Sequence, residues 1–275
     1  MNPPVHWVVM QYVYRNFVRR PNLRRFVTRL IEGNRELDIS LLGAVIRIHS
    51  IKEHGYLRAS RKIRNSSLLS DELPAIINLA SILCDGDTFV DIGANVGIYS
   101  LTLARMNRVF SGTRFYAFEA NPDTFSRLAV HAESLGVRAQ NLAISDRNGS
   151  LDFVAGAVSH VFTTVDNATE CSNMNERCSV PCRRLDSLDI EGDSLVLKID
   201  VEGQEKNVLD GASELFCAGR IKAVYLDGYK NREIEGFLRQ HGFAFFEGRT
   251  LEPVRGGVYS LLAVRSAPGT GPAHG

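Results

Sequence analysis

The sequence has little excess charge and no long apolar run. Its 275 residues include 32 Lys and Arg and 31 Asp and Glu, giving a formal net charge of +1. The apolar stretch from Val5 to Val13 is shorter than the ~20 residues that a transmembrane helix needs. The basic leader and small-residue cleavage site of a secretory signal are missing. We therefore expect a cytoplasmic protein with no membrane span and no nucleic-acid partner.

Cysteines are few, and their number is odd. Five cysteines in a chain of this length do not indicate a disulfide framework and favour a reducing compartment. Cys171, Cys178 and Cys182 form a loose group without the close pairs typical of structural zinc sites. The hydrophobic share of 44% and the charged share of 23% are typical of a soluble globular protein. We expect reduced thiols and an ordinary hydrophobic core.

Positive charge is concentrated near the N-terminus. Up to Arg64 the chain carries 13 Lys and Arg against 4 Asp and Glu. Arginines from Arg15 to Arg29 alternate with apolar residues, a pattern compatible with a basic amphipathic helix interrupted at Pro21. We favour a solvated face of a helix packed on the main domain, with weak association to a membrane surface as the alternative. β-Branched residues between 37 and 51 predict a hairpin, so residues 1–69 are interpreted as a helical segment and a hairpin.

From residue 70 onward, strand and helix patterns alternate. This order predicts an α/β domain over 70–265, in which a parallel sheet is wound by right-handed crossovers. The predicted strands are 88–92, 114–119, 137–144, 195–199 and 223–226, and the predicted helices are 98–106, 124–135, 204–216 and 232–241, after a helix that starts near 70. Strands at 243–247 and 258–264 predict an antiparallel end. The segment 150–184 is interpreted as an insertion with three short strands, and 266–275 as a disordered tail.

A glycine-containing turn follows the first of these strands, in the run FVDIGANVG at residues 89–97. Glycines there let the backbone approach a ligand, and the following helix offers unpaired N–H groups. Asp91 beside the turn would repel a pyrophosphate and suits a cationic ligand. Glu119 ends the next strand, where a carboxylate can accept both hydroxyls of a ribose. Asp91 and Glu119 together favour S-adenosylmethionine as the ligand, because it has a ribose and positive charge but no phosphate. The alternative is that Asp91 only caps its own turn.

Five motifs occur in order: FVDIGANVGIYSLTLA, FYAFEANP, NLAISDRNGSLDF, RRLDSL and LVLKIDVEGQEKNVLDGA. Together they resemble the FkbM-like family of S-adenosylmethionine-dependent methyltransferases, over roughly Asp71 to Asp227. The resemblance implies a class I, Rossmann-like fold with a doubly wound, mostly parallel seven-stranded sheet, and methyl transfer to a hydroxyl of a sugar, glycolipid or secondary metabolite. It implies cofactor contacts at Asp91, Gly93, Asn95, Gly97, Glu119, Asn141 and Ala143. Asp227 departs from the pattern, because relatives commonly end this strand in the longer Glu.

The catalytic candidates are Asp200, Glu202 and His160. Asp200 and Glu202 follow the strand 195–199 and are expected at the carboxyl edge of the sheet, where ligands bind in open α/β folds. An acceptor hydroxyl must lose a proton, so Asp200 is interpreted as a base, a metal ligand or an anchor for the sulfonium. An ordinary carboxylate is a weak base for an alcohol, which favours help from a divalent metal or a histidine. His160 in the insertion is the nearest histidine, and an ordinary surface histidine is an equal alternative.

Two other functions remain as alternatives. A non-catalytic S-adenosylmethionine-binding protein would keep the fold and the same pocket, because a fold does not fix a function. A nicotinamide-dependent oxidoreductase is less favoured, since the turn lacks the three-glycine spacing of dinucleotide-binding proteins. The interpretation we prefer is an O-methyltransferase whose partner is a small molecule with a hydroxyl group.

Overall fold

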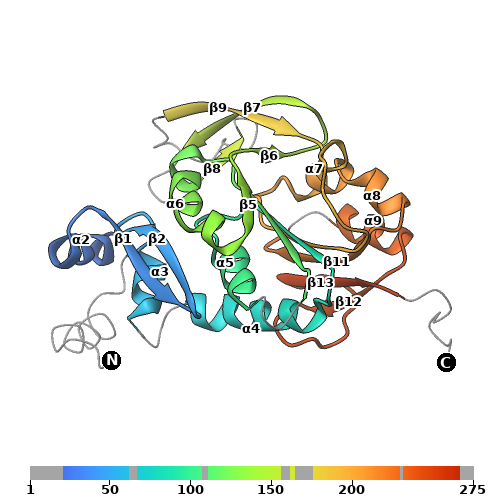
Figure 1. Cartoon of the computed structure of the whole chain (residues 1–275), viewed down its shortest axis with the longest axis horizontal. Coiled ribbons are helices and arrows are strands. Elements are labelled where there is room, and N and C mark those ends of the chain that lie inside the picture. The colour runs from blue at the N-terminus through green and yellow to red at the C-terminus, as the bar shows by residue number, and fades with distance from the viewer. Residues whose placement is uncertain are drawn as a thin grey trace.

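The computed structural model describes residues 21–61, 67–106, 111–155, 162–164, 176–229 and 232–266. Its centre is a seven-stranded sheet of order β12-β13-β11-β10-β3-β4-β5 (Figure 1). The strands are β3 (Thr88–Ile92), β4 (Arg114–Phe118), β5 (Val137–Gln140), β10 (Leu195–Ile199), β11 (Ile221–Asp227), β12 (Phe243–Glu247) and β13 (Ser260–Arg265). Strands β5, β4, β3, β10 and β11 pair in parallel, and β13 is antiparallel to β11 and β12. The predicted mostly parallel sheet with an antiparallel end is confirmed.

The strand order changes direction at β3. The chain runs outward from β3 to β4 and β5, and later returns to place β10 on the other side of β3. At such a switch point the loops after neighbouring strands lead away in opposite directions and leave a crevice for a ligand. The segments that follow β3, β4 and β10 therefore border one site.

Helices cover both faces of this sheet. They are α4 (Ser67–Ile82), α5 (Ile98–Arg105), α6 (Pro122–Ala132), α7 (Glu205–Asp210), α8 (Ser213–Cys217) and α9 (Glu233–Gln240), with short 3-10 turns at Glu133–Leu135 and Leu185–Ser187. Alternate strand residues enter two cores: Phe89 packs with α4 and α5, and Val90 packs with α7, α8 and α9. Asn121 fixes the start of α6, because its side chain accepts the N–H groups of residues 123 and 124.

One predicted helix is divided. The expectation of a single helix over 204–216 is wrong, because α7 ends at Asp210 and α8 begins at Ser213. Gly211 lies between them, and a Cβ at this position would be 1.9 Å from the carbonyl oxygen of Ser145. The carbonyl oxygen of Gly211 also accepts the N–H of Asp186 at 3.0 Å. This close packing at Gly211 interrupts the helix between α7 and α8.

A second, smaller sheet lies beside the central one. It has the order β6-β9-β7-β8, with β6 (Ala143–Ile144), β7 (Gly149–Ala155), β8 (Phe162–Thr164) and β9 (Glu176–Arg183). The single strand predicted over 137–144 is therefore wrong, since β5 belongs to the central sheet and β6 to the smaller one. Between them, the Asn141 amide donates to the carbonyl oxygens of Glu119 and Ala120 at 2.8 and 2.9 Å, which redirects the chain.

The N-terminal part contains α2 (Pro21–Glu32), the hairpin of β1 (Glu36–Leu41) and β2 (Ala44–His49), and α3 (His54–Ser60). The predicted hairpin is confirmed, and its two-residue turn has positive φ angles of 52° and 85° at Leu42 and Gly43. The start of the basic stretch and most of the predicted tail lie outside the described residues. The domain division at 69/70 stays a prediction, and α4 begins at Ser67. In the parts of the chain that the structure describes, no helix has the length and apolar character needed to cross a bilayer.

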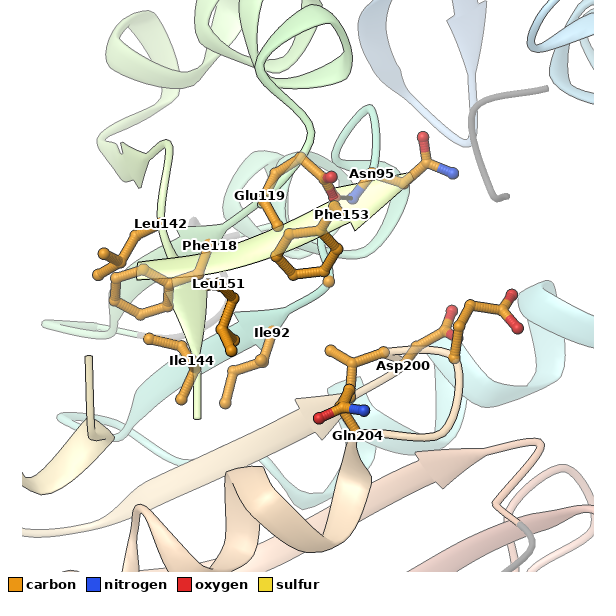
Figure 2. A pocket seen from close by; sticks show the side chains of 15 residues that line it. Ile92, Asn95, Phe118, Glu119, Leu142, Ile144, Leu151, Phe153, Asp200 and Gln204 are labelled. Carbon is orange, nitrogen blue, oxygen red and sulfur yellow. Dashed lines mark hydrogen bonds between the residues drawn. The ribbon is translucent and has the colours of Figure 1, made fainter. Parts of the chain in front are cut away.

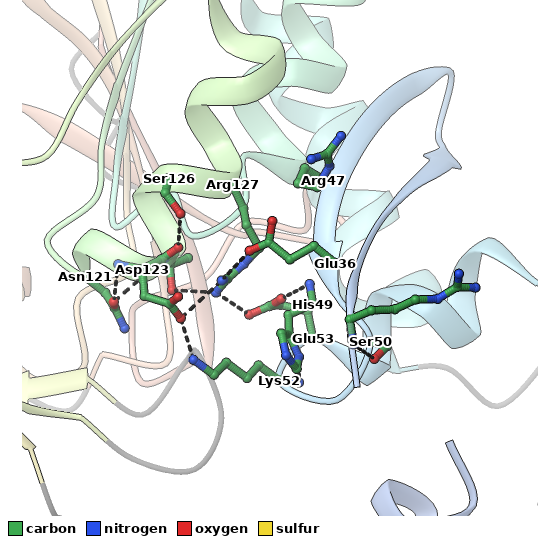
Figure 3. Close-up of polar contacts among 12 residues, drawn as sticks. Glu36, Arg47, His49, Ser50, Lys52, Glu53, Asn121, Asp123, Ser126 and Arg127 are labelled. Atoms are coloured by element: carbon green, nitrogen blue, oxygen red, sulfur yellow. Dashed lines mark hydrogen bonds and ion pairs between the residues drawn. The ribbon is translucent and has the colours of Figure 1, made fainter. Parts of the chain in front are cut away.

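A buried arginine joins this N-terminal part to the central domain (Figure 3). Arg127 on α6 has a side chain only 1% exposed, and its Nη2 donates to the fully buried carboxylate of Glu53 at 3.0 Å. Its Nη1 lies 3.4 Å from Glu36 and 3.1 Å from Asp123, whose carboxylate also binds Lys52 at 2.6 Å. The hairpin region is thus connected to α6 through one fully buried ion pair, Arg127–Glu53, and through partly exposed charges around it.

Candidate functional site

A pocket opens at the switch point of the central sheet (Figure 2). Its empty space, including the open mouth, is about 750 Å³. Its polar lining includes Gly93, Asn95, Glu119, Asp200 and Glu202. In Figure 2 the side chains of Glu119 and Asn95 lie on one side and those of Asp200 and Gln204 on the other. The pocket therefore has carboxylates on two opposing sides.

The glycine turn after β3 brings the backbone close to the loop after β10. Gly93 has a φ of +73°, and a Cβ there would be 1.9 Å from the carbonyl oxygen of Asp200, so no side chain fits. Gly97 lies behind the pocket, where a Cβ would be 2.5 Å from Leu128. Gly93 therefore forms part of the pocket wall, whereas Gly97 allows α5 to pack against α6.

Asp91 lies behind the turn and outside the pocket lining. Its carboxylate is fully buried, accepts the Ser100 N–H at 3.2 Å and lies 3.2 Å from the Lys198 ammonium. Lys198 also donates to the Gly93 carbonyl at 2.8 Å and lies 3.6 Å from Asp200. Burial lowers the pKa of Lys198, but the two carboxylates outweigh burial and hold the pKa above its ordinary value. Asp91 thus fixes a permanent positive charge under the turn, and its role as a cofactor contact stays a prediction.

Glu119 follows β4 and points into the pocket. One of its oxygens accepts the Asn95 N–H and the other accepts the Asn121 N–H, both at 2.8 Å. Burial raises the pKa of Glu119 to about 7, although the two N–H groups favour the charged form. Each carboxylate oxygen keeps lone-pair capacity for a further donor. Asn95 Oδ1 is also buried with no hydrogen-bond partner among the described residues.

The other part of the pocket is apolar. Phe118, Leu142 and Ile144 face Leu151 and Phe153, which come from the smaller sheet. Such a slot suits the flat faces of an aromatic base. Ala143 belongs to this wall, whereas Asn141 lies behind it and holds the chain after β4. The sequence interpretation missed Leu151 and Phe153, although their alternation around Asp152 signalled a strand with one buried face.

The three catalytic candidates differ in what the structure shows of them. Asp200 and Glu202 both line the pocket after β10, and the Asp200 side chain is 43% exposed. Glu202 adopts a φ of +46°, which is uncommon for a side chain of its size. His160 and Cys171 lie outside the described residues. Across the described ranges, no group of three or more His, Cys, Asp and Glu side chains is arranged to hold a metal ion, and Cys84, Cys178, Cys182 and Cys217 are free.

Comparison with known families decides the relationship. The model of the methyltransferase FkbM domain matches residues 91–245, more than half of the chain. The chain belongs to the FkbM family. The match includes the glycine turn, Glu119, the smaller sheet and the run containing Asp200, so the whole pocket lies within the FkbM domain. This family consists of S-adenosylmethionine-dependent methyltransferases, as the sequence motifs implied.

Several solved structures of methyltransferases are similar to this FkbM-family protein, at low sequence identity. A methyltransferase FkbM from Methylobacillus flagellatus is 14% identical, with a TM-score of 0.45; the match covers 66% of this chain and 44% of that protein, less than half its length. A TehB-like S-adenosylmethionine-dependent methyltransferase from Corynebacterium glutamicum is 13% identical, with 77% and 97% covered and a TM-score of 0.41. An S-adenosylmethionine-dependent O-methyltransferase from Thermotoga maritima is 13% identical, with 72% and 66% covered and a TM-score of 0.39. A comparison with curated proteins finds no match.

Proposed function

We propose that this FkbM-family protein transfers a methyl group from S-adenosylmethionine to a hydroxyl group of a small molecule. The observation that carries the proposal is the pocket at the switch point, where Glu119 and Asp200 lie on opposite sides beside an apolar slot. A ribose, an aromatic base and a cationic group would each meet a suitable surface there. The acceptor hydroxyl would approach from the side of Asp200.

The residues present fit this cofactor. Glu119 would accept the ribose hydroxyls, and Phe118 and Phe153 would border the adenine. Neither Lys nor Arg is among the described residues that line the pocket, whereas Asp200 and Glu202 are. A sulfonium and an ammonium are favoured by such surroundings, and a pyrophosphate is not. The bound cofactor would supply an electrophilic methyl group.

The catalytic residues of the proposal are Asp200, Glu202 and His160. The position of Asp200, which follows β10 and lines the pocket beside the Gly93 turn, supports a role near the methyl group and the acceptor. Its carboxylate would orient the hydroxyl and balance the positive charge. We also propose a cytoplasmic location, which the free thiols of the described cysteines support.

The first test is thermal unfolding of the full chain with S-adenosylhomocysteine, the demethylated cofactor. A ligand bound only by the folded state stabilises it by about 2.7 kcal/mol at 100 times its Kd, so the melting temperature should rise. NAD at the same concentration should give no comparable shift. A larger shift with NAD would overturn the proposal, and binding without labelled methyl transfer to any pool of hydroxylated metabolites would favour a non-catalytic binding protein.

A second prediction concerns the proposed ribose ligand. Replacing Glu119 with Ala should weaken S-adenosylhomocysteine binding by about 2–3 kcal/mol, the scale for losing hydrogen bonds to a charged group. Calorimetric titration measures this change. The pKa of Glu119 is about 7, so the affinity of the unaltered protein should fall as the pH drops below 7, where the carboxylate takes up a proton.

The matched control is Glu133→Ala, which removes an exposed glutamate beyond the end of α6. It should leave affinity and its pH dependence unchanged. Equal affinities in a folded Glu119→Ala variant and in the control would show that Glu119 is not the ribose ligand.

A further inference from the structure

Glu72 on α4 is a titratable group that the proposed mechanism does not use. Its Oε2 is buried and has no hydrogen-bond partner among the described residues. A buried carboxyl oxygen without a partner is costly, and a catalytic role is one of the reasons that such a group is retained. Glu72 therefore requires an explanation outside the packing of α4.

Charged groups from several elements surround Glu72. Burial raises its pKa to about 8; Lys198 counteracts this shift, whereas Asp200, Asp227 and Asp91 add to it. Burial raises the pKa values of two phenols, the partly buried Tyr56 on α3 and the buried Tyr99 on α5, and the charge of Glu72 raises them further. Glu72 is thus mostly protonated at neutral pH and titrates just above it.

The strand register explains how these groups come together. β10 and β11 are parallel neighbours in which Ile199 pairs with Leu226, so Asp200 and Asp227 follow at the same edge of the sheet. Asp200 lines the cofactor pocket, whereas Asp227 does not. We name Glu72, Asp200 and Asp227 the acidic cluster. Asp200 borders the proposed cofactor pocket, and Asp227 is the last residue of β11.

Helix α4 is held in place above this edge. Asn78 donates to the Gly248 carbonyl at 2.9 Å, and Arg249 donates to Asp71, next to Glu72, at 3.3 Å. Arg249 also lies 3.9 Å from Asp227, whose carboxylate accepts the Ser260 hydroxyl at 2.6 Å. The contacts of Asn78 and Asp71 with residues 248 and 249 therefore fix the helix that carries Glu72, and Arg249 connects this helix to Asp227 at the end of β11.

We infer that the acidic cluster is the acceptor site, that it takes an uncharged molecule bearing hydroxyl groups, and that Glu72 accepts the proton of the methylated hydroxyl. This inference rests on the proposed function. The acceptor oxygen forms a bond to the methyl carbon while the carbon–sulfur bond breaks and leaves its electron pair on sulfur. The hydroxyl proton goes to the Glu72 carboxylate, which leaves a neutral ether and a neutral thioether.

Glu72 suits this role better than Asp200. The Asp200 carboxylate is already engaged by the Lys198 ammonium at 3.6 Å. Glu72 Oε2 has no hydrogen-bond partner among the described residues, and Lys198 only partly offsets the effect of burial on the pKa of Glu72. A base that titrates near the working pH combines adequate basicity with a substantial charged fraction. An anionic acceptor would meet Asp200 and Asp227, while Lys198 is already shared between Asp91 and Asp200. Neutral polyols are therefore the expected class.

The experiment uses the full chain, labelled S-adenosylmethionine and two acceptor pools, neutral methyl glycosides and sugar phosphates, between about pH 6 and 9. The unaltered protein should label the neutral pool, with a rate that rises to a plateau above about pH 8. Glu72→Gln should lower this rate by about 100-fold or more at the plateau and abolish the rise, while the affinity for S-adenosylhomocysteine changes less than about twofold. Glu252→Gln, an exposed control, should change neither.

Unfolding measured against pH provides a readout that is independent of turnover. The folded-state pKa of Glu72 is raised, so the contribution of this group to the free energy of unfolding is fully present below its ordinary pKa and is lost as the pH rises from there toward about 8. In Glu72→Gln the free energy of unfolding should no longer fall through the ionisation of this residue. The same measurement shows whether the variant is folded. Preferential labelling of sugar phosphates, labelling of other hydroxylated metabolites but not of the neutral glycosides, or an unchanged pH profile in Glu72→Gln would overturn the inference. Cofactor binding without labelling of any pool would count against the proposed function. Protein that binds neither form of the cofactor would overturn the proposed function instead.

Discussion

Replacing Arg127 with Ala is expected to destabilise the fold by about 3–5 kcal/mol, the usual loss when one partner of a buried ion pair is removed. The guanidinium is 1% exposed, and the Glu53 carboxylate that it contacts is fully buried. Without Arg127 this carboxylate would have to stay charged without its cation or take up a proton. Chemical denaturation at neutral pH measures the change in the free energy of unfolding.

Two further variants identify the cause. Arg114→Ala removes an exposed ion pair with Glu191; the two side chains are 41% and 45% exposed. This substitution should lower the free energy of unfolding by less than about 1 kcal/mol. Replacing Arg127 and Glu53 together with Leu should recover most of the stability, because no unpaired charge remains. A loss of less than about 1 kcal/mol in Arg127→Ala would show that the pair does not hold the hairpin region to α6.

Replacing Asp200 with Asn should lower turnover by about 10²- to 10⁴-fold, the range for a residue that takes part directly in proton transfer or in orienting the reacting hydroxyl. The amide keeps the shape and removes the charge. The fold should survive, because Lys198 keeps its contacts with Asp91 and the Gly93 carbonyl. Initial rates with labelled cofactor, on the acceptor found by screening, measure the effect, and cofactor affinity should change much less than turnover.

The matched control is Asp193→Asn, an exposed aspartate just before β10, at the amino end of the strand that Asp200 follows. It should leave turnover unchanged. Comparing both proteins with added Mg²⁺ and with a chelator separates a metal-dependent role of Asp200 from a metal-independent one. Near-normal turnover in Asp200→Asn would move the catalytic assignment to Glu202 and His160.

The fold was predictable where local patterns and topology agree. Buried strands such as Thr88–Ile92 and Leu195–Ile199 appeared at the predicted bounds, because continuous apolar runs between turns have few other stable arrangements. The errors arose where a tertiary contact overrides the pattern. Gly211 packs on the Ser145 carbonyl and divides a helix, and the Asn141 amide moves the chain from one sheet to another.

The site was predictable for residues that close a strand. Glu119 and Asp200 each follow a parallel strand, and such positions share one edge of the sheet. The apolar wall was not predictable, because Phe153 reaches the pocket through the position of the smaller sheet, which a strand pattern does not fix. Glu72 was missed for a similar reason: on α4 it is one acidic residue of a helix start, and only tertiary packing gives it buried surroundings.

The pocket has walls from two sheets, since Phe118 belongs to the central sheet whereas Leu151 and Phe153 belong to the smaller one. A molecule held between these walls adds a contact that neither sheet makes alone. Binding of this molecule would therefore stabilise the packing of the smaller sheet against the central sheet. We therefore expect local opening of the smaller sheet to favour release of the ligand, so that the affinity of the site depends on the stability of strands outside the central sheet.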